Sequence, residues 1–422
     1  MSNFGVLSFK GTGHLNPLIA LSRELIAHGH KVTFIHKPEM EARVREHGID
    51  FCSVGHSDSR PFQEKLVDKK PKPSGGIATI QYGLKRIGEE IEMFLREGPT
   101  AITQAGIEVL IVDEIALAGP TLAEMLRLPY FILSTSVPHH FGWDTPSLGM
   151  ESRSWTDSLQ RAILEVSVLQ MRGPVRHKLD KIRRRYGLGP IRNIKRVFPE
   201  LAHITPLPQC LDLPHANLPD NFYYTGPFVD ETARRPVEFP WQFLDGRRLV
   251  YASLGTTLKG EPNTFRMIAE ACDGLDLQLV ISLGDRRDPE LFRDLPGKPL
   301  VVRNAPQLEL LKRADAVITH AGPNTAFEAL MQGKPMVALP KAFDQPAIAA
   351  RLQRAGVAEV LLRKNLSAFQ IRAALIKVVH DPSYRVAAKT LQAKILSIRG
   401  LDQAVDIIEK ALNVGSCGPI DR

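Results

Sequence analysis

Residues 303–345, RNAPQLELLKRADAVITHAGPNTAFEALMQGKPMVALPKAFDQ, contain more interpretable chemistry than any other part of the chain. The apolar run at 314–319 predicts a short strand, HAGP predicts a turn, 324–332 predict a helix, and PMVALP at 335–340 predicts the next strand. In open parallel sheets, ligands bind where strands end and helices begin. This strand–turn–helix–strand unit therefore predicts a binding site.

The start of the predicted helix has the features of an anion site. Pro323 suits the first helical position and Gly333 suits the position after the last. The backbone amides of Asn324 and Thr325 then lie at the positive end of the helix dipole, where phosphate binds favourably. His320, just before the turn, can add a donor.

Three more polar residues extend this pattern towards a sugar. Glu328 follows Asn324 at i+4 on the same helix face, where its carboxylate can accept from the vicinal hydroxyls of a ribose. Asp344 and Gln345 arrive at the end of the next strand. Taken alone, His320 is more typical of a structural histidine, and the Asp-Gln pair of a helix cap. Their joint spacing favours a nucleotide followed by a sugar.

This spacing resembles the donor-binding signature of family 1 glycosyltransferases, nucleotide-sugar enzymes with the two-domain GT-B fold. The bacterial macrolide and zeaxanthin glucosyltransferase branch is the most similar. In that family the histidine of H-x-G-x-N contacts diphosphate, the asparagine and the next residue contact phosphate, the glutamate holds ribose, and an Asp-Gln pair holds the hexose. The resemblance assigns donor binding to His320, Gly322, Asn324, Thr325, Glu328, Asp344 and Gln345.

The region that contacts the nucleotide base departs from the plant members. Their aromatic base-stacking residue is Asn304 or Arg303 here, and the second tryptophan of their motif is Pro323, although Gln307 of APQ is retained as a donor-binding residue. UDP-glucose is the expected donor, and a dTDP-linked sugar stays open.

Length and composition indicate two or three domains of an ordinary globular chain of 422 residues. The four cysteines show no C-x-x-C spacing, which fits a reducing compartment. Neither a secretory signal nor an apolar run of membrane-spanning length is apparent, so we expect a cytoplasmic protein. With no metal-ligand spacing and no D-x-D motif, we expect no cofactor and no metal.

The formal net charge of +8 is concentrated between residues 151 and 200, where twelve Lys or Arg face five acids. No nucleic-acid recognition motif accompanies them. A basic helical segment can instead touch anionic lipid, which would suit a lipophilic acceptor and a peripheral membrane association. The simplest alternative is a solvated face.

Two series of apolar strands separated by helices predict an α/β protein with two Rossmann-like doubly wound parallel sheets. We expect an acceptor-binding domain at 1–226, a Pro- and Arg-rich linker at 227–246 and a nucleotide-sugar domain at 247–383. A last helix, 384–412, is expected to return to the first domain, as the GT-B fold implies.

The loop GTGHLNP, residues 11–17, follows the first predicted strand. It approximates G-x-G-x-x-G, but an NAD site needs an acid after the second strand, where His36 and Lys37 stand. His14 lies at the ligand-facing edge and can take a proton from an acceptor hydroxyl, or it can simply bond backbone at a helix start. The resemblance favours catalysis, because the family's catalytic histidine lies in a G-H-x-x-P setting that His14 and Pro17 reproduce.

A base histidine works best when a carboxylate fixes its tautomer. Asp113 ends the predicted strand EVLIVD and resembles the family's partner aspartate, with Glu114 as the alternative and a helix cap as the simpler role.

Two further segments are candidates for binding. The turn SLGTT offers Ser253, Gly255 and Thr256 to a phosphate or sugar, or is only a tight turn. The acceptor pocket is expected in the irregular region from 134 onward, and its candidate lining, which is also typical of a core, comprises His139, His140, Phe141 and Trp143.

The resulting hypothesis is an inverting glycosyltransferase that moves glucose from UDP-glucose to a hydroxyl of a lipophilic or aromatic small molecule, giving a β-glycoside. His14 would be the base and Asp113 its partner. A GT-B sugar-nucleotide epimerase, a nicotinamide oxidoreductase and a non-catalytic sugar-nucleotide binder are the alternatives.

Overall fold

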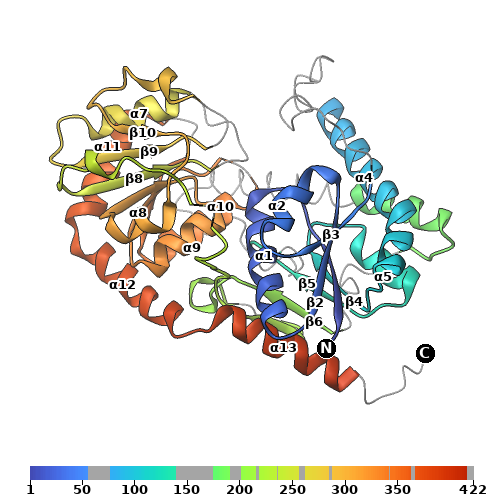
Figure 1. Cartoon of the computed structure of the whole chain (residues 1–422). Coiled ribbons are helices and arrows are strands. Elements are labelled where there is room, and N and C mark those ends of the chain that lie inside the picture. Colours follow the sequence, from blue (N-terminus) through green and yellow to red (C-terminus); the bar gives the residue numbers. More distant parts are fainter. Residues whose placement is uncertain are drawn as a thin grey trace.

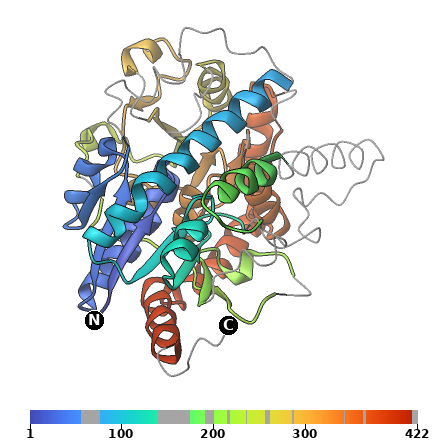
Figure 2. The same cartoon turned by 90° about the vertical axis from the view of Figure 1, so that its right-hand side faces the viewer.

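The computed structural model describes residues 1–55, 77–138, 174–190, 201–214, 218–234, 236–255, 262–284, 288–341, 343–362 and 366–415. They form two parallel β-sheets, each covered by helices, with the last helices running from the second sheet back to the first (Figures 1 and 2). The predicted pair of Rossmann-like sheets is confirmed.

Within the described residues, the first sheet has seven strands in the order β3-β2-β1-β4-β5-β6-β7. They are β1 (Asn3–Leu7), β2 (Lys31–His36), β3 (Asp50–Ser53), β4 (Val109–Asp113), β5 (Tyr130–Leu133), β6 (Ala202–Thr205) and β7 (Phe222–Tyr224). All neighbours are parallel, with Phe4 of β1 in register with Val32 and Val109. The central strands are buried along almost their whole length because helices cover both faces.

The helices around this sheet divide into two layers. They are α1 (Thr12–Ala27), η1 (Pro38–Met40), α2 (Glu41–Arg45), α4 (Ile77–Gln104), α5 (Gly119–Leu126) and η3 (Gln209–Leu211). Leu15 and Leu18 of α1 pack on one face, in the same core as Val405 and Ile408 near the carboxyl end of the chain. Phe94 and Leu122 belong to the core on the other face.

The second sheet, again among the described residues, has six strands in the order β10-β9-β8-β11-β12-β13. They are β8 (Leu249–Ser253), β9 (Gln278–Ser282), β10 (Leu300–Val302), β11 (Ala316–Thr319), β12 (Met336–Ala338) and β13 (Ala358–Val360). A short helix, η4 (Trp241–Phe243), lies within the predicted linker, and the helices around the second sheet are α7 (Pro262–Cys272), η5 (Pro289–Phe292), α8 (Gln307–Arg313), α9 (Pro323–Met331), α10 (Gln345–Arg354) and α11 (Ala368–His380). The two strands predicted at 314–319 and 335–340 are present as β11 and β12.

The chain ends in two helices, α12 (Pro382–Leu396) and α13 (Gly400–Gly415), where the sequence predicts a single helix. The second of these helices begins at a glycine. A side chain at Gly400 would collide with the backbone carbonyls of Gly226 and Pro227, so the close approach of α13 to the linker needs a glycine. Beyond the break, α13 packs on α1, side by side in Figure 1.

One apolar core joins the two halves. It contains Leu207 and Leu211 beside the first sheet, Ile348 and Leu352 of α10, and Leu391 of α12. The carboxyl edges of the two sheets therefore meet across packed side chains. No helix in the described part of the chain combines the length and apolar composition needed to span a membrane.

Candidate active site

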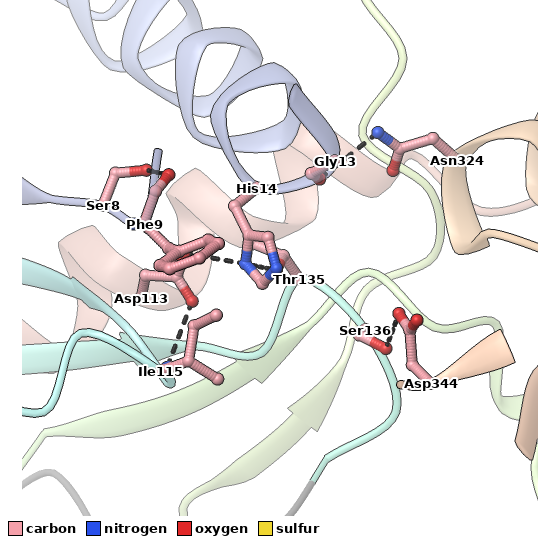
Figure 3. Close-up of polar contacts among 10 residues, drawn as sticks. All are labelled: Ser8, Phe9, Gly13, His14, Asp113, Ile115, Thr135, Ser136, Asn324 and Asp344. Atoms are coloured by element: carbon pink, nitrogen blue, oxygen red, sulfur yellow. Dashed lines mark hydrogen bonds and ion pairs between the residues drawn. The ribbon is translucent and has the colours of Figure 1, made fainter. Parts of the chain in front are cut away.

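Two residues predicted from the second half, Asn324 and Asp344, contact the first half close to His14 and Asp113 (Figure 3). Asn324 Nδ2 donates to the Gly13 carbonyl at 3.3 Å, and Ser136 Oγ donates to Asp344 Oδ2 at 2.5 Å. In each pair, one residue belongs to the half with the first sheet and the other to the half with the second sheet. The arrangement is one site with two sides.

His14 lies in the first turn of α1, not in a loop before the helix as predicted. Gly11 is the extended residue before the helix, and its carbonyl accepts from the His14 amide at 2.9 Å. The glycines and the proline suggest a loop by composition, but Gly13 and Pro17 lie within the helix and Gly11 directly before it. The helix fixes the direction of the imidazole.

Asp113, the last residue of β4, is the partner of that imidazole. Its Oδ2 lies 2.9 Å from His14 Nδ1, and its side chain is 1 % exposed against 22 % for His14. A carboxylate only accepts, so Nδ1 carries the proton and Nε2 is the nitrogen with a lone pair for a substrate. The pair has the geometry of a general base with its orienting carboxylate.

Backbone and ring contacts hold the pair in place. The amides of Phe9 and Ile115 each donate to the Asp113 carboxylate at 3.2 Å. The Phe9 ring stands edge-on to His14, with ring centroids 5.3 Å apart. Glu114, the alternative to Asp113, follows the end of the strand, and its amide donates to the Leu133 carbonyl.

Pro17 explains why the Gly13 carbonyl bonds to the other domain. In α1 the acceptor for residue 17 would be Gly13, but proline has no N–H to donate. The side-chain amide of Asn324 takes that place. The proline of the G-H-x-x-P pattern thus opens a helix carbonyl for contact across the domains.

The start of α9 has the predicted geometry. Pro323 is in the first turn, Gly322 is the extended residue before the helix, and Ala321 has a left-handed φ of 61°. A side chain at Gly322 or at Gly255 would collide with the His320 imidazole. Both predicted glycines therefore make room for that ring beside the helix start, where anions bind.

Glu328 lies on α9 with its side chain 1 % exposed and forms an ion pair with Arg234 of the linker. Its Oε2 accepts from Gln307 Nε2 at 2.6 Å, and Gln307 Oε1 accepts from the Tyr251 hydroxyl at 3.1 Å. Burial raises the pKa of Tyr251 to about 12, so this hydroxyl stays a donor. The predicted ribose carboxylate is thus held by groups from three segments.

Asp344 and Gln345 begin α10, yet the Asp344 side chain makes no cap bond. It accepts from Ser136 instead, and Gln345 Oε1 accepts from the Lys341 amide at 2.9 Å. The simple capping role considered for the Asp344 side chain is therefore wrong.

The remaining predicted residues divide into two groups. Ser253 and Thr325 are buried at the end of β8 and in the first turn of α9. The others lie outside the described residues: Thr256, His139, His140, Phe141 and Trp143.

The structure adds residues that the sequence did not single out. Thr135 Oγ1 lies 2.7 Å from His14 Nδ1, Ser136 reaches Asp344, and Arg234 pairs with Glu328. A run of hydroxyl residues directly after β5 is a signal for the first two, since strand ends face ligands. Arg234 lies in a linker without such a pattern. The described residues contain no group of three or more His, Cys, Asp or Glu arranged to hold a metal ion.

Comparison with known families identifies the class of protein. A family model described as UDP-glucoronosyl and UDP-glucosyl transferase matches residues 198–412, and a glycosyltransferase family 28 N-terminal domain matches residues 6–138. The chain belongs to the UDP-glucoronosyl and UDP-glucosyl transferase family and is a glycosyltransferase. Both halves of the site fall within these matches.

Individual relatives agree with this class. The chain is 29 % identical to the zeaxanthin glucosyltransferase of Pantoea ananas, over 98 % of this chain and 97 % of that protein. It is 24 % identical to the NDP-glycosyltransferase YjiC of Bacillus subtilis strain 168, over 96 % of each chain. The solved structure of the kitacinnamycin glycotransferase superposes with a TM-score of 0.75 at 22 % identity, over 97 % of this chain and 98 % of that one. The fold is GT-B, as the resemblance implied.

Proposed function

We propose that this glycosyltransferase is an inverting enzyme that moves glucose from UDP-glucose to a hydroxyl group of a lipophilic or aromatic small molecule. The observation that carries the proposal is the His14–Asp113 pair at the same junction as Asn324 and Asp344. A base from one domain thereby adjoins the residues proposed to hold the sugar nucleotide in the other.

In the proposed reaction, Nε2 of His14 takes the proton of the acceptor hydroxyl. The oxygen attacks the anomeric carbon as the bond from that carbon to the diphosphate oxygen breaks, and UDP leaves with the electron pair. Asp113 stabilises the imidazolium that forms, because its carboxylate holds Nδ1–H. Attack in line from the opposite side turns an α-linked donor into a β-glycoside.

The negative charge that develops on the leaving diphosphate needs stabilising donors. We assign this role to His320 and to the first amides of α9, since a helix start binds anions without further help. The Asp-Gln pair at 344–345 would hold the hexose hydroxyls, and Glu328 the ribose. The proposal includes no metal ion, so a chelator should leave the rate unchanged.

The acceptor class rests on the relatives. The Pantoea ananas relative is named for zeaxanthin, which supports a lipophilic acceptor here. The Bacillus subtilis relative is named for an unspecified nucleoside diphosphate, so the preference for UDP over dTDP is the part of the proposal to test first.

Two described arginines of the basic segment at 151–200 bind other residues of the first domain, so the proposal does not use them for membrane contact. Arg183 is buried and donates to Thr121 and Glu124 of α5, and Arg185 pairs with Glu92 of α4 at 2.8 Å. These two charges support the packing of the first domain.

The test is incubation with UDP-glucose or dTDP-glucose and a panel of hydroxylated acceptors, with product mass and nucleotide release followed together. Acceptor-dependent UDP release and a product heavier by one hexose are expected, with a β anomeric proton by NMR. Release of nucleotide with none of the pairs, or an α-glycoside, would contradict the proposal. A change in the sugar without any acceptor would favour a sugar-nucleotide epimerase.

A further inference from the structure

Helix α10 carries the proposed sugar-holding residues at its start and a buried arginine two turns later. Asp344 stands just before the helix and Arg351 seven residues on, so both lie on one helix face. Both contact the first domain: Asp344 accepts from Ser136, and Arg351 Nε donates to Asp212 Oδ1 at 2.7 Å. One face of a second-domain helix is thus aligned on the domain that supplies the base.

The arginine contact belongs to a buried polar network. The side chains of Arg351 and Asp212 are 1 % and 2 % exposed. Asp212 Oδ1 also accepts from the Leu213 amide at 2.7 Å, and Oδ2 accepts from the Tyr224 hydroxyl at 2.6 Å. Burial opposes the charge of Asp212, but the charge of Arg351 and the Tyr224 bond keep the pKa of that carboxyl below its usual value.

This network is surrounded by the apolar core that joins the domains. Ile348, between Asp344 and Arg351 on α10, shares that core with Leu207, which precedes η3, and with Leu211, the last residue of η3. A buried pair in such surroundings has little freedom, since a shift of either partner leaves a charge without compensation. The position of α10 is therefore defined by the first domain as well as by its own sheet.

We propose that Arg351, held by Asp212, is a positioning residue that sets Asp344 and Gln345, and hence the donor sugar, at the correct distance from His14. The inference rests on the proposed function of these residues. It adds that the sugar is positioned by the contact between Arg351 and Asp212, called here the interdomain joint. The nucleotide, in contrast, is held within the second domain by His320 and Glu328. Transfer should depend on the joint, and nucleotide binding should not.

The variants Arg351→Met and Arg351→Lys test the proposal. Methionine removes the charge at similar length, and lysine keeps the charge but loses the planar fork of the guanidinium. Arg354→Met is the matched control, because Arg354 is a basic residue on the same helix with an exposed side chain. Urea unfolding, UDP affinity by calorimetry, and the rates of acceptor transfer and of UDP-glucose hydrolysis are measured on each folded variant.

For Arg351→Lys we expect UDP affinity within about twofold of the unaltered protein, a transfer kcat lower by about tenfold or more, and a higher ratio of hydrolysis to transfer. Arg351→Met should show the larger change of the two, and Arg354→Met none. If Arg351→Met does not fold, Arg351→Lys alone decides.

Two results would contradict a positioning role for Arg351. One is a loss of transfer in proportion to the unfolded fraction, with an unchanged ratio of hydrolysis to transfer. The other is a fall in UDP affinity equal to the fall in kcat. Failure of the proposed function gives a different result, since the unaltered protein itself would then release no UDP with any acceptor.

Discussion

The two sides of the site are held in different ways. On the first sheet, His14 is oriented by a carboxylate and two backbone amides behind it, and its ring is partly exposed. On the second sheet, the proposed ribose carboxylate, Glu328, is almost fully buried and bonded to Arg234 and Gln307. The base is thus already oriented with one nitrogen accessible, whereas a bound nucleotide must share or replace the hydrogen bonds that Glu328 makes with Arg234 and Gln307.

The difference follows from what each side has to do. A general base needs one fixed tautomer and one accessible nitrogen. A binding site for a polar ligand needs buried acceptors, and these cost free energy unless protein groups pair with them in the absence of the ligand. Changes on the first side should therefore lower the rate, and changes on the second side should lower donor affinity.

Among the changes that leave His14 in place, Asp113→Asn should have the largest effect. An amide can present its NH₂ to Nδ1 and favour the wrong tautomer, so we expect transfer to fall by about 10³-fold, or about 4 kcal/mol in the barrier. Initial rates at saturating donor measure it, with Glu114→Gln as the control. A similar loss of transfer in both variants would mean that Asp113 is not the specific partner of His14.

His36→Gln tests a histidine at the same edge of the sheet as His14, for which we expect a role in stability and not in catalysis. Burial, followed by the charge of Lys37, lowers the pKa of His36 from 6.5 to about 4. The unfolded chain then binds a proton that the folded chain does not, so stability is lost as pH falls from 6.5 to about 4, by about 3 kcal/mol. Urea unfolding at several pH values should show a shallower acid slope in His36→Gln. The exposed His380→Gln should keep the original slope.

Glu328→Ala tests the second side. Loss of a charged acceptor for the ribose should weaken UDP binding by about 10- to 100-fold, equivalent to about 1.5–3 kcal/mol. Calorimetry with UDP measures this, and comparison with 2′-deoxyuridine diphosphate shows whether the effect belongs to the ribose. An equal loss for both nucleotides would mean that Glu328 acts only through Arg234 and Gln307.

Thr135→Val should give the smallest effect. The Thr135 hydroxyl lies close to His14 Nδ1, but Asp113 already fixes that nitrogen. We expect a decrease of only a few-fold in kcat, about 1 kcal/mol, with donor affinity unchanged. A loss as large as that of Asp113→Asn would make the hydroxyl the main orienting group.

The second side could be predicted from sequence because its residues follow one another within 303–345, where strand and helix periodicity fixes their relative positions. The first side is assembled from β1, β4 and β5, so His14 and Asp113 depended on the family resemblance, and Thr135 was missed. The short strands β6 and β7, AHIT and FYY, carry too little pattern to be predicted. Arg234, Asp212 and Arg351 could not be anticipated, because contacts between domains leave no local periodicity.

The central claim is that a base from the first domain acts on a sugar held by the second, and His14→Ala tests it most directly. Transfer rate and UDP affinity are measured on the same preparation. We predict a fall in kcat of at least about 10³-fold, no smaller than that of Asp113→Asn, with UDP affinity within about twofold of the unaltered protein. An undiminished transfer rate in His14→Ala would contradict the account.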